Sequence, residues 1–187
     1  MIVGKAIQLP SVALPQADWY RCVPAQFAHT PPRASTGRTR FNPGHLRILY
    51  FAPNPRLALF EARALLGSYF HASVPSPGQP YVVVQYQIHI GQQACIVDAR
   101  EYELPVIDTT IQEMTGDWFT YPRNFPTTAI HAPTQNLADA IHRRRDEPVG
   151  LMAPSARNPF ADNLILFEDR LPADSVAFHS VVEPDQI

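Results

Sequence analysis

Proline is the residue type that most constrains how this chain can fold. The 187 residues include 20 prolines and only 8 glycines. Proline interrupts helices and sheet interiors because it lacks a backbone N–H, so the chain is divided into short elements with stiff connections. Long helical bundles are therefore disfavoured. With 45% hydrophobic residues, residues 1–187 are expected to form one domain with a substantial hydrophobic core.

Charge and cysteine content exclude several classes of function. The formal net charge is −2, from 15 basic and 17 acidic residues, so no basic field would attract nucleic acid or anionic lipid. Cys22 and Cys95 are too few for a disulfide framework, and the 7 histidines lack metal-ligand spacing. No segment approaches the roughly 20 apolar residues of a membrane span. We therefore expect a cytoplasmic protein that binds no membrane, nucleic acid or metal.

Short apolar runs predict most of the β-structure. Each run is rich in Val, Ile, Leu, Tyr or Phe and is bounded by Pro, Gly, Asn or Asp. Few helices are expected between them, so an α+β fold with mostly antiparallel sheets is predicted instead of regular βαβ alternation. The predicted strands are Ile48–Ala52, Tyr81–Ile90, Cys95–Ala99, Val149–Ala153, Leu164–Phe167 and Val176–Val182.

Two helices are predicted, and the first has clear boundaries. It begins after Asn54, a good N-cap, with Pro55 at the first helical position, and it ends at Gly67, which suits a C-terminal cap. The second is predicted from Asn136 to Arg144. Loops are predicted at Thr30–Gly44, Ser73–Pro80 and Tyr121–Pro133.

One carboxylate of the first helix lies on the face that should be apolar. At about 100° per residue, Glu61 falls between Leu57 and Ala58. A buried carboxylate is costly unless it is paired or hydrogen-bonded, so Glu61 should face a pocket, an internal arginine or the frayed rim of the helix. A structural ion pair and a functional site both remain open. The predicted apolar face comprises Leu57, Ala58, Phe60, Ala64 and Leu65.

Four short motifs in order resemble the RES family of bacterial toxins, which is named for its Arg, Glu and Ser. They are Arg40–Gly44 (RFNPG), Tyr50–Ala52 (YFA), Ala58–Glu61 (ALFE), and Pro154–Ser155 followed by Asn163–Leu164. Trp19-Tyr20-Arg21 also resembles the start of the family, so the resemblance runs from about Asp18 to Glu168.

The resemblance implies a fold similar to that of the ADP-ribosyltransferase toxins, with NAD held in a cleft as substrate and no separate cofactor. RES proteins commonly deplete NAD by hydrolysis or phosphorolysis, or ADP-ribosylate a target. They are commonly paired with an Xre-type antitoxin. We therefore expect an NAD-consuming enzyme with such a protein as partner, and a homo-oligomer is compatible with this interpretation.

The residues that match the family suit this chemistry. Cleavage of the nicotinamide–ribose bond leaves positive charge on the sugar, which Glu61 could stabilise. Arg40 could offer a planar fork of donors to the pyrophosphate, and Tyr50 could stack on nicotinamide or ribose. Ser155 could reach the ligand or orient Glu61. Further candidates for substrate binding are Asn42, Arg21 and Asn163.

Other interpretations of the same residues remain open. Arg40 could be a surface arginine, Tyr50 a core aromatic and Ser155 an ordinary turn residue. The ribosyl cation could be captured by a protein side chain, which would make the chain an ADP-ribosyltransferase. A catalytically silent partner-binding module is a third hypothesis, because Arg38-Thr39 replaces the family's Gly-Gly. No serine-hydrolase, Rossmann or P-loop motif is present.

Overall fold

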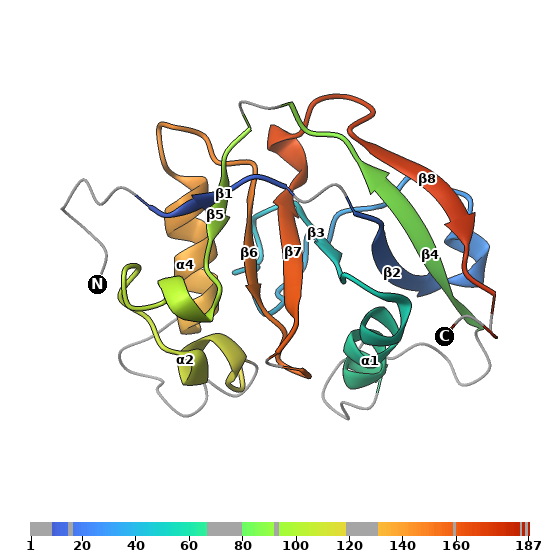
Figure 1. Cartoon of the computed structure of the whole chain (residues 1–187), viewed down its shortest axis with the longest axis horizontal. Helices are drawn as coiled ribbons and strands as arrows, with labels where there is room; N and C mark the ends of the chain where they lie inside the picture. Colours follow the sequence, from blue (N-terminus) through green and yellow to red (C-terminus); the bar gives the residue numbers. More distant parts are fainter. Residues whose placement is uncertain are drawn as a thin grey trace.

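Two β-sheets lie side by side in the computed structural model, which describes residues 9–14, 17–66, 80–91, 94–118, 131–158, 160–183, 185 and 187 (Figure 1). The five-stranded sheet has the order β1-β5-β6-β7-β3, and the three-stranded sheet has the order β2-β4-β8. The strands are β1 (Ser11–Val12), β2 (Trp19–Pro24), β3 (Ile48–Phe51), β4 (Tyr81–Ile88), β5 (Ile96–Asp98), β6 (Gly150–Pro154), β7 (Asp162–Phe167) and β8 (Val176–Val181).

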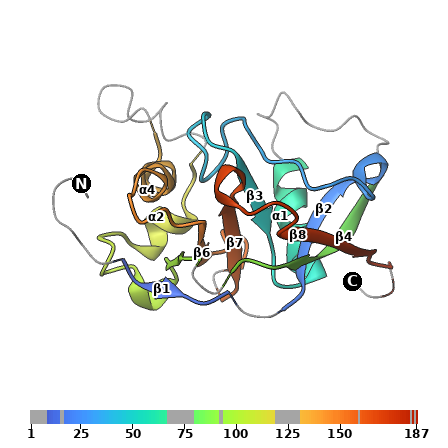
Figure 2. The ribbon, with the colours of Figure 1, turned by 90° about the horizontal axis from the view of Figure 1, so that it is seen from above.

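The described helices are few and short. They are α1 (Pro55–Leu66), α2 (Ile111–Thr115) and α4 (Pro133–His142), with 3-10 turns at Ala25–Phe27, Glu101–Glu103 and Glu168–Arg170. Figure 2 shows α2 and α4 at one end of the molecule and α1 beside the three-stranded sheet. Among the described strands every neighbouring pair is antiparallel except β5 and β6. The predicted α+β class with mostly antiparallel sheets is confirmed.

All six predicted strands are present, with ends that differ by a few residues. The prediction missed β2, which pairs along its whole length with β4, from Trp19 opposite Tyr86 to Pro24 opposite Tyr81. Arg21 interrupts its apolar pattern, because this side chain faces a cavity instead of the core. The prediction also missed the two-residue strand β1, which is too short to show a pattern.

Strands β6 and β7 are buried on both faces. Leu151 and Ile165 point to a cluster that includes residues of α2 and α4, whereas Met152 and Leu164 point to a second cluster shared with the three-stranded sheet. Strands covered on both sides need apolar residues at every position. This explains why both segments were uninterrupted hydrophobic runs in the sequence.

Helix α1 begins where the sequence predicts, and one residue of its predicted apolar face, Phe60, is not buried. Asn54 Oδ1 accepts a hydrogen bond of 2.8 Å from the Leu57 backbone N–H, as an N-cap does. Leu57 and Ala58 are buried in a cluster with Val83 of the smaller sheet and Val182, the residue after β8, whereas Phe60 is 46% exposed. The buried face is therefore centred near Glu61, and Phe60, about 100° away from it, points to solvent. Gly67, the predicted end, lies outside the described residues.

The second predicted helix, α4, starts three residues before the predicted position, at Pro133, and ends at His142 instead of Arg144. Proline suits the first helical position because its φ is already helical and its missing N–H has no partner there. The Gln135 side chain also accepts a bond of 3.0 Å from the Ala132 N–H. Of the predicted loops, Thr30–Gly44 is largely irregular, and most of the other two lies outside the described residues. No described helix is long and apolar enough to cross a membrane.

Candidate functional site

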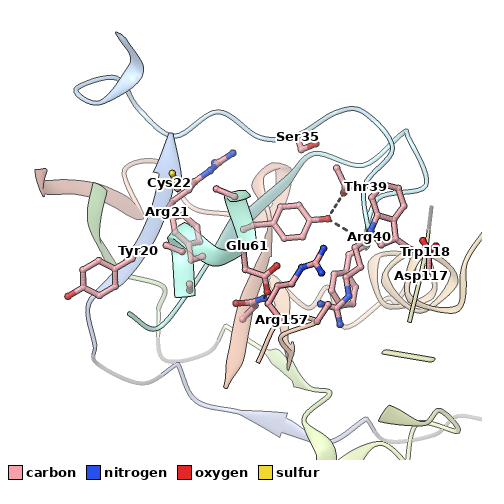
Figure 3. Close-up of a pocket in the computed structure, with 18 residues that line it drawn as sticks. Tyr20, Arg21, Cys22, Ser35, Thr39, Arg40, Glu61, Asp117, Trp118 and Arg157 are labelled. Atoms are coloured by element: carbon pink, nitrogen blue, oxygen red, sulfur yellow. Dashed lines mark hydrogen bonds between the residues drawn. The ribbon is translucent and has the colours of Figure 1, made fainter. Parts of the chain in front are cut away.

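A cavity of about 410 Å³ lies where β2, β3, α1 and the turn after β6 meet (Figure 3). This volume is within the usual range of small-molecule sites. Segments that are distant in sequence form its wall, including the loop before β3 and the segment after α2. Its charged lining residues are Arg21, Arg40, Arg157, Glu61 and Asp117.

Glu61 projects from α1 into this cavity and is held by two neutral donors. Its Oε1 accepts a bond of 2.5 Å from Ser155 Oγ and one of 2.7 Å from Asn163 Nδ2. Within the described part of the chain Glu61 forms no ion pair, and its Oε2 receives no hydrogen bond. The structural ion pair considered above is therefore absent there. Glu61 lines a pocket, which is one of the alternatives that the helical spacing left open.

Ser155 is fully buried directly after β6. Its Oγ accepts hydrogen bonds from the backbone N–H groups of Arg157 at 3.0 Å and Asn158 at 3.1 Å. Because the oxygen already accepts two bonds, its single proton is directed to Glu61. Of the two roles considered, the geometry favours orienting Glu61 over reaching a ligand.

Arg40 lines the cavity but is only 9% exposed, so it is not a surface arginine. Its Nη2 donates to the backbone carbonyls of Met114 and of Pro154, the latter at 2.9 Å, and its buried Nε has no partner in the described residues. Burial lowers the pKa of Arg40 to about 10, with Glu61 opposing this shift, so the side chain stays positive at neutral pH.

The N-terminal turn of α4 holds the loop that carries Arg40. Thr134 Oγ1 donates to the Arg40 carbonyl at 2.5 Å, and Gln135 Nε2 donates to the Thr39 carbonyl at 2.7 Å. Both side chains are buried. The sequence prediction missed them because it placed Thr134 and Gln135 before the helix. The available signal was Pro133, which marks a helix start with polar residues in its first turn.

Tyr50 is on β3 and lines the cavity, and hydrogen bonds hold its hydroxyl group in place. The hydroxyl lies 2.5 Å from Thr39 Oγ1 and accepts a bond of 3.2 Å from the Phe41 N–H (dashed lines in Figure 3). Burial raises the pKa of Tyr50 to about 12. At neutral pH the residue is therefore a neutral phenol with an immobilised ring.

Two of the three further candidates line the cavity, and one does not. Arg21 reaches it from β2, with Nη1 donating to the Arg33 carbonyl at 3.0 Å, and Asn163 reaches it from β7. Asn42 is 0% exposed and lies outside the cavity lining. Its amide donates to the carbonyls of Ser35 and Leu46 and accepts from the N–H groups of Gly44 and Leu46. Its predicted role in substrate binding is wrong, because all of its polar atoms hold the loop.

The structure thus brings together residues that are far apart in sequence. Arg40, Tyr50 and Glu61 line one cavity, and Ser155 lies one hydrogen bond behind Glu61. Sequence reasoning did not single out Arg157, a further lining residue. A carboxylate facing three arginines suits a ligand with both cationic and anionic parts.

Comparisons with known proteins point to one family. The model of the RES domain family matches residues 10–185. No curated protein matches the chain. A chain in the crystal structure of the M. tuberculosis MbcT–MbcA toxin–antitoxin complex is similar, with a TM-score of 0.61 and 14% sequence identity. That similarity covers 93% of this chain and 84% of the other, and at such low identity it establishes a shared fold.

Proposed function

The chain belongs to the RES domain family, and we propose that it is an NAD-consuming toxin. It cleaves the bond between nicotinamide and ribose, by hydrolysis or by phosphorolysis. The observation that carries this proposal is Glu61, a carboxylate without an ion-pair partner in the described residues, which two neutral donors orient inside a cavity with an arginine-rich wall.

Glu61 is suited to stabilise the ribosyl cation. Loss of nicotinamide gives an oxocarbenium-like transition state, and a preoriented carboxylate stabilises that charge more strongly in a site of low polarity than in water. Ser155 and Asn163 both engage Oε1. Oε2 is therefore the oxygen that would face the sugar or accept hydrogen bonds from its hydroxyls.

The rest of NAD matches the other lining residues. Arg40 and Arg21 supply positive charge for the pyrophosphate. Tyr50 offers a ring face to nicotinamide or ribose, and its bonds to Thr39 and Phe41 hold that ring in place without a ligand. Because the Tyr50 phenol is neutral at pH 7, it packs against the substrate and does not act as a base.

The proposal includes a neutralising partner. The similar solved chain belongs to a complex described as toxin and antitoxin. We extend that pairing to this chain, with an Xre-type antitoxin and a location in the cytoplasm, where the NAD pool is found. NAD is the substrate, and no resident cofactor is required.

Nicotinamide release tests the function directly. Purified chain is incubated with NAD, with and without inorganic phosphate, and free nicotinamide is followed over time. Release without phosphate indicates hydrolysis, and release that requires phosphate indicates phosphorolysis. The Glu61→Gln variant, purified in the same way, is measured beside it, because loss of release in this variant assigns the activity to the chain and not to a contaminating host enzyme. Absence of release under both conditions would overturn the proposal.

The same incubation separates cleavage from transfer to a protein. NAD labelled in its adenylate half is added with cell extract, and proteins are examined for covalent label. Label that appears on a protein only with the unmodified chain would identify an ADP-ribosyltransferase. Free nicotinamide without protein labelling supports the proposed NAD cleavage.

A further inference from the structure

Arg157 is a charged residue of the cavity lining that the proposed chemistry leaves unused. It lies in the turn between β6 and β7, lines the cavity and is exposed. Within the described part of the chain, its guanidinium forms no ion pair or hydrogen bond. A free guanidinium offers several donors in a plane, which matches the oxygens of a phosphate group.

The other two arginines of the cavity already use some of their donors. Arg40 donates to the carbonyls of Met114 and Pro154, and Arg21 donates to that of Arg33. These bonds fix their positions. Arg157 therefore differs from them in having its whole fork of donors available to a ligand.

The backbone of Arg157 is linked to the proposed reaction centre. Its N–H donates to Ser155 Oγ at 3.0 Å, and the same oxygen donates to Glu61 Oε1 at 2.5 Å. In the view of Figure 3, Arg157 lies between Glu61 and Arg40. Burial is the main cause of the lowered pKa of Arg40, and the positive charge of Arg157 adds to it. Two cations that line one cavity favour an anion between them.

We propose that Arg157 is a further substrate-binding residue, whose guanidinium holds a phosphate group of the ligand next to Glu61. This inference rests on the proposed function. The phosphate group has two sources, the pyrophosphate of NAD and a free inorganic phosphate that attacks the ribose. Both present the same oxygens to the arginine, so kinetics must distinguish them.

A substrate without phosphate provides the sharpest test. Nicotinamide riboside contains the bond to be cleaved but no phosphate group. If Arg157 holds the pyrophosphate of NAD, we expect KM for NAD to rise about 10- to 100-fold in Arg157→Gln, as for loss of a charge-assisted hydrogen bond. If the reaction is hydrolysis, cleavage of nicotinamide riboside should change less than about twofold in the absence of phosphate. A variant that simply distorted the turn would impair the cleavage of both substrates.

Titration with inorganic phosphate identifies which phosphate group Arg157 binds. If Arg157 binds the pyrophosphate of NAD, KM for NAD rises in the variant and the dependence on free phosphate is unchanged. If it binds inorganic phosphate, the concentration of phosphate needed for half-maximal rate rises instead. Either result supports the proposal. Unchanged values for both, in Arg157→Gln compared with the exposed control Arg145→Gln, would overturn it.

A binding measurement separates this inference from the function. Inorganic pyrophosphate is titrated calorimetrically into the full chain and the two variants, with no turnover required. We expect Arg157→Gln to weaken binding at least about tenfold, Arg157→Lys to restore part of it, and Arg145→Gln to leave it unchanged. This pattern supports the inference even if NAD is not cleaved. Equal affinity of Arg157→Gln and the unmodified chain, or no binding by the unmodified chain, refutes it.

Discussion

The two charged walls of the cavity are held in place in different ways. On one wall, Ser155 and Asn163 donate to the carboxylate of Glu61 itself. On the other wall, the Arg40 guanidinium donates to the backbone carbonyls of Met114 and Pro154. The first network holds the charge of Glu61 without depending on it for folding, whereas in the second network the charged group of Arg40 itself bonds to the backbone.

Substitutions on the two walls are therefore expected to affect activity and stability to different extents. Glutamine at position 61 can still accept two hydrogen bonds at a carbonyl oxygen, so the first wall can survive loss of its charge. Removal of Arg40 leaves two buried carbonyls without a donor. Substitutions on the Glu61 wall should therefore lower the reaction rate. Substitutions on the Arg40 wall should lower both the reaction rate and the free energy of unfolding.

The largest effect is expected from Glu61→Gln. Loss of the negative charge should lower the rate of nicotinamide release by about 10²- to 10³-fold. The free energy of unfolding in urea should change by less than about 1 kcal/mol, because Ser155 and Asn163 keep an acceptor. A variant with full activity would remove Glu61 from the mechanism. A large loss of stability would show that the Glu61 wall, like the Arg40 wall, depends on its charged side chain for folding.

Arg40→Met should have the next largest effect, which is a loss of stability. Two buried carbonyls lose their donor, so we expect the free energy of unfolding to fall by about 2–4 kcal/mol, measured by urea denaturation. The control is Arg145→Met at an exposed position, with an expected change within about 0.5 kcal/mol. Equal stability of the two variants would show that Arg40 has no role in holding its wall.

Ser155→Ala should have an intermediate effect on both properties. It removes one donor to Glu61 and one acceptor for the N–H groups of Arg157 and Asn158. We expect a loss of about 1–3 kcal/mol in unfolding free energy and about tenfold in the rate of nicotinamide release. Loss of stability with full activity would show that Asn163 alone orients Glu61.

Tyr50→Phe gives the smallest effect, which depends on pH. Burial raises the pKa of Tyr50 to about 12 in the folded chain, compared with about 10 in an unfolded chain. The stability that the phenol contributes is therefore complete below about pH 10 and is lost as the pH rises towards 12. The difference in unfolding free energy between Tyr50→Phe and the unmodified chain should shrink from about pH 9 to about pH 11.5. A constant difference would contradict the raised pKa.

The parts of the fold that could be predicted are those with a local signal. The Asn54-Pro55 pair specified the start of α1, because capping and a fixed φ depend on neighbours in sequence. Strands β6 and β7 were predicted because burial on both faces demands uninterrupted apolar residues. Glu61 was singled out because helical spacing placed it among buried residues.

The contacts that complete the site depend on tertiary structure. No local pattern shows that Thr134 and Gln135 hold the loop of Arg40. Asn42 matched a family motif, yet its environment makes it a loop residue with every polar atom bonded. Phe60 was assigned to the apolar face because its type suggested burial, whereas the position of α1 against the smaller sheet turns it outward. The order of the RES motifs was the one sequence signal that linked Glu61 to Ser155.

The hydrogen bonds of Ser155 make the two oxygens of Glu61 chemically unequal. Oε1 already receives donors from Ser155 and Asn163, so its lone pairs are occupied. A proton accepted by this carboxyl group would consequently be added to Oε2. Proton transfer at Glu61 would therefore involve Oε2, and a group that donates a proton to Glu61 or removes one from it must contact this oxygen.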